Sequence, residues 1–284
     1  MNIPKHMELF AKEMERRNYS PMTVKNYVSN LGVFFNYFKL KEHPLHLNES
    51  DIKDYLGQFD EPNTQRSHHG AIKKYYEICL NQKDKFKHIP YCRKDKKLPI
   101  VLSFDEIQRM FDVCKNKKHK VILALLYSCS LRVSELINLK WKDIDRSRMI
   151  INIIQAKGNK DRQVGLNDHL ITILSEYCKE YNIKKDIFIY VLTGQSGKEQ
   201  YSEKSVGEVV KQLATKAGIC NKRVYTHLMR HTSATHMVEN NVDINLIQRL
   251  LGHSNVKTTS IYLHTSHNLI SKIPSPLTQI RLNK

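Results

Sequence analysis

Thr226-His227-Leu228-Met229-Arg230-His231 is the most informative string in this chain. Leu251-Gly252-His253-Ser254 follows it, and Tyr262 stands nine residues after His253. On a helix, side chains three residues apart share a face, so His227 and Arg230 would point at one object. A guanidinium offers a planar fork of donors that fits two phosphate oxygens, and an imidazole beside it can donate a hydrogen bond or move a proton near neutral pH. These residues therefore indicate a site that handles phosphate.

Other interpretations of the same residues stay open at this point. His227 and Arg230 could simply be solvated on a helix surface. His227 and His231 have the spacing of some zinc ligands, although neither an H-E-x-x-H motif nor a cysteine cluster accompanies them. Tyr262 is one of 14 tyrosines and could be packing in a core. To attack phosphorus, a phenol with an ordinary pKa of about 10 would need a cationic pocket.

Composition indicates which molecule carries the phosphate. Lys and Arg number 46 against 28 Asp and Glu, which gives a formal net charge of +18 and a pI of about 9.5. Such a surface attracts a polyanion, so nucleic acid is the expected partner. The six cysteines form no C-x-x-C pair and nothing near Met1 resembles an export signal, so we expect a cytoplasmic protein. No apolar run approaches the roughly 20 residues of a membrane span, and no membrane role is expected.

The first part of the chain predicts a small bundle of helices over residues 1–85. Ser20-Pro21 combines an N-cap with a proline at the first helical position, and apolar residues then recur at helical spacing as far as Phe38. Shorter helices are expected before this one and, after it, near Ser50 and Asn63. Residues 86–99 are predicted to be a basic linker lying on phosphates, because residues 83–97 carry a net charge of +5. An ordinary solvated loop is the alternative.

A second, larger domain is expected over residues 100–284. Ser103 and Glu106 form a capping box that opens a helix. Residues 149–155 and 163–166 predict the two strands of a β-hairpin that turns at Gly158-Asn159, with Lys157 at its tip. Gly252 is a suitable stop for a preceding helix. Further helices are predicted at about 168–181, 202–217, 226–240 and 243–251. The predicted fold class is therefore mainly α with a small β-hairpin or sheet.

Arg132 follows an apolar helix that should end near Cys129. Its guanidinium could point inward, oriented by a carboxylate such as Glu135. It could equally form an ordinary ion pair at the surface. From spacing alone we favour the surface ion pair.

The order of these motifs resembles that of the tyrosine recombinase family, also called phage integrases. The motifs are Leu131-Arg132-Val133-Ser134-Glu135-Leu136, Lys157-Gly158-Asn159-Lys160-Asp161-Arg162, His227-x-x-Arg230-His231, Leu250-Leu251-Gly252-His253 and Ile261-Tyr262. The resemblance covers nearly the whole chain, since residues 18–23 resemble the entrance to the family's N-terminal core-binding domain and residues 98–106 the start of its mostly helical catalytic domain. Ser130, Val133 and Met229 stand where the family often has glycine, isoleucine and leucine, and no functional group is lost.

The resemblance implies a role for six residues. Arg132 and Arg230 would clamp the non-bridging oxygens of the scissile phosphate, and Lys157 would protonate the leaving 5′ oxygen. His227 would assist proton transfer, and His253 would hydrogen-bond the phosphate. Tyr262 would attack to form a 3′-phosphotyrosyl link. Phosphoryl transfer is mostly positioning and charge stabilisation, so neither a metal, another cofactor nor ATP is expected.

The resemblance also implies a function and partners. The chain would be a site-specific recombinase, Xer-like or of a mobile element, that integrates, excises or resolves DNA through a Holliday junction. A homo-tetramer would act on two synapsed double-stranded sites, and accessory DNA-bending proteins could assist. A catalytically silent DNA-binding regulator of the same fold and a topoisomerase-like nicking-closing enzyme are the alternatives. The tail over residues 266–284 is apolar enough to dock on a neighbouring protomer or on its own domain.

Overall fold

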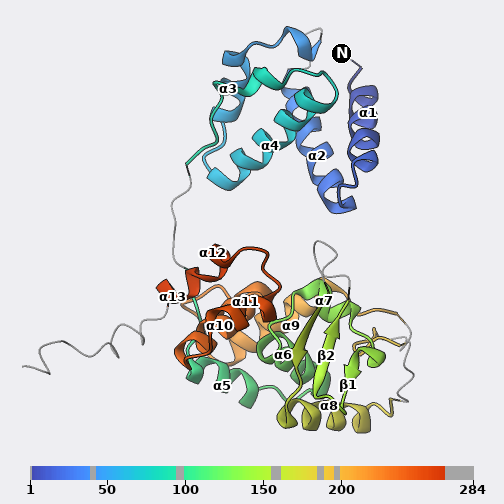
Figure 1. The fold of residues 1–284 in the computed structure, drawn as a ribbon, viewed down its shortest axis with the longest axis vertical. Helices are drawn as coiled ribbons and strands as arrows, with labels where there is room; N and C mark the ends of the chain where they lie inside the picture. Colours follow the sequence, from blue (N-terminus) through green and yellow to red (C-terminus); the bar gives the residue numbers. More distant parts are fainter. Residues whose placement is uncertain are drawn as a thin grey trace, which may run out of the picture. The chain divides into compact units, whose positions relative to one another are not determined.

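The computed structural model describes residues 2–38, 43–93, 99–154, 161–183, 189–194 and 199–265. The chain divides into two compact units, residues 1–97 and 98–284 (Figure 1). Both are mainly helical and the second contains a small sheet, which confirms the predicted fold class. The tail over residues 266–284 and the hairpin tip that carries Lys157 lie outside the described residues.

The first unit is a bundle of helices around an aromatic core. Ser20 caps the second helix, its hydroxyl accepting the backbone N–H of Thr23, and Pro21 is the first helical residue, as predicted. The rings of Phe34, Phe35 and Tyr75 are fully buried. The helices are α1 (Ile3–Arg16), α2 (Pro21–Tyr37), α3 (Glu49–Gly57) and α4 (Pro62–Ile78), with 3-10 turns η1 (Pro44–His46) and η2 (Lys83–Phe86).

The second unit is built around one buried helix, α6 (Lys117–Ser128), which packs against α8 (Asp168–Glu180) and α10 (Thr226–Glu239). Every residue from Val121 to Leu126 is buried, so apolar neighbours cover this helix on all sides. The predicted capping box of Ser103 and Glu106 opens α5. The other helices are α5 (Phe104–Asp112), α7 (Val133–Asn138), α8 (Asp168–Glu180), α9 (Glu203–Lys216), α10 (Thr226–Glu239), α11 (Ile244–Leu251), α12 (Val256–Thr259) and α13 (Ile261–Thr265), with the 3-10 turn η3 (Trp141–Asp143).

A three-stranded antiparallel sheet flanks these helices (Figure 1). Its strands are β1 (Ile144–Asp145), β2 (Ile150–Ile153) and β3 (Arg162–Gly165), in that order. The predicted hairpin is β2 and β3, and its register pairs Ile153 with Arg162. Strand β1 was not predicted, because two residues are too few to show an alternating pattern. This register fixes the position of Arg162, whose side chain belongs to the candidate site described below.

Candidate active site

Arg132 occupies the N-cap position of α7, three residues before Glu135. Its backbone N–H donates to Oε2 of Glu135 at 2.8 Å, and its Nη1 donates to Oε1 at 2.7 Å. The carboxylate is buried, with 8% of Glu135 exposed. The surface ion pair that spacing favoured is therefore wrong. Arg132 points inward, toward Glu135, and a second arginine binds the same carboxylate.

The second partner of Glu135 is Arg162, the first residue of β3. Its Nη1 and Nη2 donate to the two carboxylate oxygens at 2.6 and 2.7 Å, and its Nε donates to the carbonyl of Leu250 at 2.6 Å. Gly252 ends α11 in the left-handed conformation, with φ +62, and a Cβ there would lie 3.0 Å from Cδ of Arg162. Arg162 therefore joins the sheet to α7 and to the end of α11. The sequence motif contained Arg162, but no role was predicted for it.

The charges around Glu135 leave the cluster positive. Burial alone would raise the pKa of Glu135, but hydrogen bonds from Arg162 and Arg132 hold it at about 2. The carboxylate is therefore ionised at neutral pH. Arg230 lies at the edge of the same group, with Nη1 4.0 Å from Oε2. Three guanidinium groups around one carboxylate leave a net charge that an anion could neutralise.

Arg230 projects from α10 and is 1% exposed. Its Nη1 donates to the carbonyl of Ser130 at 2.7 Å, and its Nη2 donates to the carbonyl of Leu251. Nη2 of Arg132 reaches the same Leu251 carbonyl at 3.4 Å. Burial and the charges of Arg132 and Arg162 lower the pKa of Arg230 to about 9, so the group is still a cation at neutral pH. The two predicted arginines thus meet at the C-terminal end of α11, where the helix dipole favours positive charge.

The two predicted histidines both lie near the two arginines. His227 is an exposed residue in the first turn of α10. Its pKa is nevertheless lowered, first by partial desolvation and then by the positive charges of Arg230 and Arg132. His253 directly follows α11, and its Nδ1 shares a hydrogen bond of 3.0 Å with Oγ1 of the fully buried Thr259. Burial and the nearby arginines lower the pKa of His253 to about 4. His253 is therefore a neutral imidazole at pH 7.

Tyr262 lies on α13 with 2% of its surface exposed. Its ring belongs to a cluster of buried apolar side chains, and its hydroxyl shares a hydrogen bond of 2.9 Å with Nδ1 of His231. Burial raises the pKa of Tyr262, whereas Arg230 and Arg132 act in the opposite direction. Both arginines are therefore close enough to favour the ionised form of the phenol. His231 was considered only as a zinc ligand; among the described residues no group of His, Cys, Asp and Glu is arranged to hold a metal.

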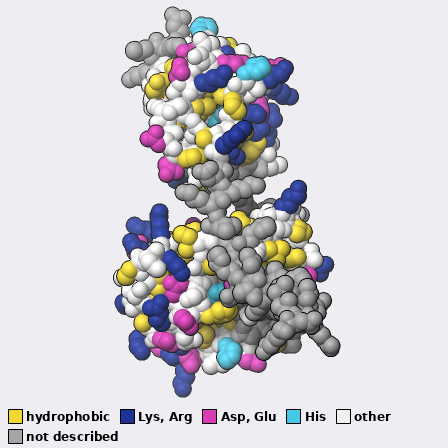
Figure 2. All heavy atoms as spheres, turned by 90° about the vertical axis from the view of Figure 1, so that its left-hand side faces the viewer, with side chains coloured by type: hydrophobic (Ala, Val, Ile, Leu, Met, Phe, Trp, Pro, Cys, Tyr) yellow, Lys and Arg dark blue, Asp and Glu magenta, His cyan; other side chains and the backbone are white. Residues whose placement is uncertain are grey.

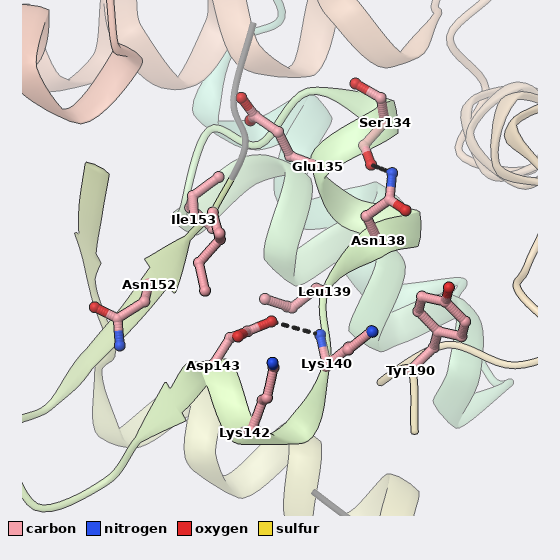
Figure 3. Close-up of a pocket in the computed structure, with 11 residues that line it drawn as sticks. Ser134, Glu135, Asn138, Leu139, Lys140, Lys142, Asp143, Asn152, Ile153 and Tyr190 are labelled. Atoms are coloured by element: carbon pink, nitrogen blue, oxygen red, sulfur yellow. Dashed lines mark hydrogen bonds between the residues drawn. The ribbon is translucent and has the colours of Figure 1, made fainter. Parts of the chain in front are cut away.

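A polar pocket beside α7 is lined by Glu135 but by none of the arginines and histidines described above, nor by Tyr262 (Figure 3). Its volume is about 400 Å³. Oδ2 of Asp143 accepts the backbone N–H of Lys140 at 2.9 Å, and Nδ2 of Asn138 donates to the carbonyl of Ser134 at 2.7 Å, so the lining is internally bonded (Figure 3). In the described part of the chain no helix is both long and apolar enough to span a membrane.

Two family profiles together match most of the chain. Residues 101–268 match the phage integrase family, and residues 7–84 match the phage integrase N-terminal SAM-like domain. The two matched ranges fall one in each compact unit.

Individual proteins match over similar lengths. The chain is 32% identical over 286 residues to the tyrosine recombinase XerC of Staphylococcus epidermidis, a match that covers 93% of each protein. It is 33% identical over 266 residues to the tyrosine recombinase XerA of Pyrococcus horikoshii, covering 90% of this chain and 87% of XerA. In structure it is similar to the XerH site-specific recombinase bound to a palindromic difH substrate in a post-cleavage complex, with a TM-score of 0.76, 20% identity and coverage of 92% and 82%. This last similarity concerns the fold.

Proposed function

The chain belongs to the phage integrase family, and on this basis we propose how its own residues cut and rejoin DNA. It is a site-specific tyrosine recombinase. Arg132 and Arg230 bind the non-bridging oxygens of the scissile phosphate, and His253 hydrogen-bonds the same group. His227 assists proton transfer beside them.

Tyr262 is the nucleophile in this mechanism. Its oxygen bonds to phosphorus, the bond from phosphorus to the 5′ oxygen breaks, and Lys157 protonates the leaving oxygen. A 3′-phosphotyrosyl link replaces the phosphodiester, so the energy of the bond is kept. The 5′ hydroxyl of another strand can then attack the link and release Tyr262, which requires no ATP.

The observation that carries this proposal is the meeting of Arg132 and Arg230 at the Leu251 carbonyl, within electrostatic reach of Tyr262. A phosphate would accept the same N–H groups with stronger, charge-assisted hydrogen bonds. The donors are already oriented by Glu135 and by backbone carbonyls, so little reorganisation is needed as negative charge develops on phosphorus.

The proposed partner is double-stranded DNA that carries specific recombination sites. The net charge of +18 and the many Lys and Arg side chains on both units provide attraction to phosphates (Figure 2). A homo-tetramer on two synapsed sites would exchange the strands through a Holliday junction. Base contacts, rather than this charge, would choose the site.

A nicked suicide substrate tests the reaction, because loss of a short 5′ fragment traps the covalent link. The wild type should form a protein–DNA adduct, and Tyr262→Phe should bind the same DNA without forming one. Arg230→Ala should also bind but cleave far more slowly. Binding without any wild-type adduct would instead identify a DNA-binding regulator. Relaxation of supercoiled DNA that lacks the site would identify a nicking-closing enzyme.

A further inference from the structure

We propose that His231 is the general base that removes the proton from Tyr262 during cleavage. This inference rests on Tyr262 being the nucleophile and adds a catalytic group to those named above. The resemblance placed the proton-transfer role on His227, which is four residues earlier on α10.

The geometry favours His231 because it contacts the atom that reacts. Nδ1 of His231 lies 2.9 Å from the phenol oxygen, a distance suited to direct proton transfer. The two rings are 5.7 Å apart between centroids and tilted by 50°. Because α10 also carries Arg230, the residue before His231, one helix positions both a phosphate ligand and the partner of the nucleophile.

The exposed His227 packs against the ring of His231. Its centroid lies 4.6 Å from that of His231, with the rings nearly perpendicular. His231 thus contacts both the buried phenol and a histidine at the surface. Once His231 has taken the proton from Tyr262, the imidazole of His227 lies next to it. This position fits an assisting role for His227 in proton transfer.

Burial and the neighbouring charges keep His231 in its neutral form. Burial, His227 and Arg230 lower its pKa to about 4, so the ring is neutral at pH 7 and its Nδ1 lone pair can accept the phenol hydrogen bond. When a phosphate binds Arg230, its negative charge compensates that cation. The pKa of His231 then rises, which helps the ring to hold the proton that Tyr262 releases.

Cleavage begins with transfer of the Tyr262 proton to His231. The Tyr262 oxygen bonds to phosphorus while its O–H bond breaks, and the proton moves to Nδ1 to give an imidazolium. The bond between phosphorus and the 5′ oxygen breaks, and that oxygen takes a proton from the general acid. On rejoining, a 5′ hydroxyl attacks phosphorus and gives its proton back to the general acid, which is now deprotonated. The bond between phosphorus and the Tyr262 oxygen breaks, and the imidazolium returns its proton to the departing phenolate.

The test is single-turnover adduct formation by His231→Ala on the suicide substrate. Loss of a general base should slow cleavage by about 10² to 10⁴-fold. Added imidazole should restore part of the rate. Replacing Tyr262 by 3-fluorotyrosine, whose phenol is more acidic, should accelerate His231→Ala by at least about tenfold more than it accelerates the wild type, since an acidic phenol depends less on a base.

His236 provides a matched control on the same helix. It is buried, and its Nδ1 shares a 2.8 Å hydrogen bond with the hydroxyl of Tyr127. His236→Ala should remove a comparable contact without gaining rate from imidazole or from fluorination at position 262. If His231→Ala behaves as His236→Ala does, His231 is structural and the proposal is overturned.

A second variant covers the case in which His231→Ala unfolds. In His231→Asn the amide oxygen can accept the phenol hydrogen bond but cannot carry away a proton. It should keep wild-type stability and cleave at least about tenfold more slowly, and a wild-type rate would overturn the proposal. Absence of any adduct with the wild type would contradict the proposed nucleophile itself, which is a different result.

Discussion

Arg162 and Glu135 form a buried ion pair with two parallel hydrogen bonds, of 2.6 and 2.7 Å. The pair joins the first residue of β3 to the first turn of α7, and hence the sheet to the arginine cluster. It also explains how the anionic Glu135 can lie beside arginines that are proposed to bind a phosphate. Because Arg162 satisfies both oxygens of Glu135, the charge of Arg132 is only partly used and can attract a phosphate.

We expect Arg162→Met to destabilise the second unit by about 3–5 kcal/mol, because it leaves a buried carboxylate without its main partner. Urea unfolding followed by tryptophan fluorescence measures this effect, since Trp141, the single tryptophan of the chain, lies in that unit. Adduct formation should slow as well, because Glu135 would then draw Arg132 more strongly.

Arg148→Met is the matched control for this loss. Arg148 pairs with Asp145 of β1 at 3.8 Å, and 77% of its side chain is exposed. An exposed pair of this kind contributes less than about 1 kcal/mol. Equal losses in the two variants would contradict the special role of Arg162.

The stability of the second unit should fall in acid through Glu135. Its folded pKa of about 2 is below the ordinary value of 4.5, so its contribution is complete above about pH 5 and is lost as the pH falls towards 2. The contribution amounts to about 3 kcal/mol. Other carboxylates titrate in the same range, so the measured quantity is the difference between the wild type and Glu135→Gln. This difference in unfolding free energy should shrink from pH 6 to pH 2.5, and a constant difference would contradict the pKa.

Gly252→Ala should impair both stability and cleavage. The left-handed φ of +62 costs an alanine about 1 kcal/mol, and the new Cβ would lie 3.0 Å from Cδ of Arg162 and push it away from Glu135. Gly218→Ala is the control, because Gly218 has φ +71 but its nearest neighbour, Nη1 of Arg109, would be 3.8 Å from the Cβ. Both variants should lose stability in urea, and only Gly252→Ala should slow adduct formation.

Local signals in the sequence predicted the elements of this fold well. The Ser20 cap, the Ser103 capping box and the Gly252 stop each act within a few residues, and each is present in the structure. Turn chemistry predicted the hairpin in the same way. What spacing could not show was the inward orientation of Arg132, because the buried Glu135 that it binds is also held by Arg162, which is 30 residues from Arg132 in the chain.

His231 and Arg162 share the reason why they were missed. Both lie inside motifs that were quoted, but their partners, Tyr262 and Glu135, come from distant elements that only the packed fold brings together. Ser130 illustrates the opposite case. It adopts φ +50, which explains why glycine suits this position, and a 2.7 Å hydrogen bond to Ser233 helps to hold the strained serine in place.

The last prediction concerns the orientation of His253. Thr259→Val keeps the shape of a fully buried side chain but removes the oxygen that bonds Nδ1 of His253. If His253 binds the phosphate through its other nitrogen, the ring should become less well placed, and single-turnover cleavage should slow by about tenfold, the equivalent of 1.4 kcal/mol. DNA affinity, measured at fixed salt, should stay the same, because most of it comes from other phosphate contacts.

Thr259→Ser should restore the rate, and Thr258→Val, at the exposed neighbouring position, should leave it unchanged. Equal rates for Thr259→Val and the wild type would show that this hydrogen bond does not orient His253 for the reaction.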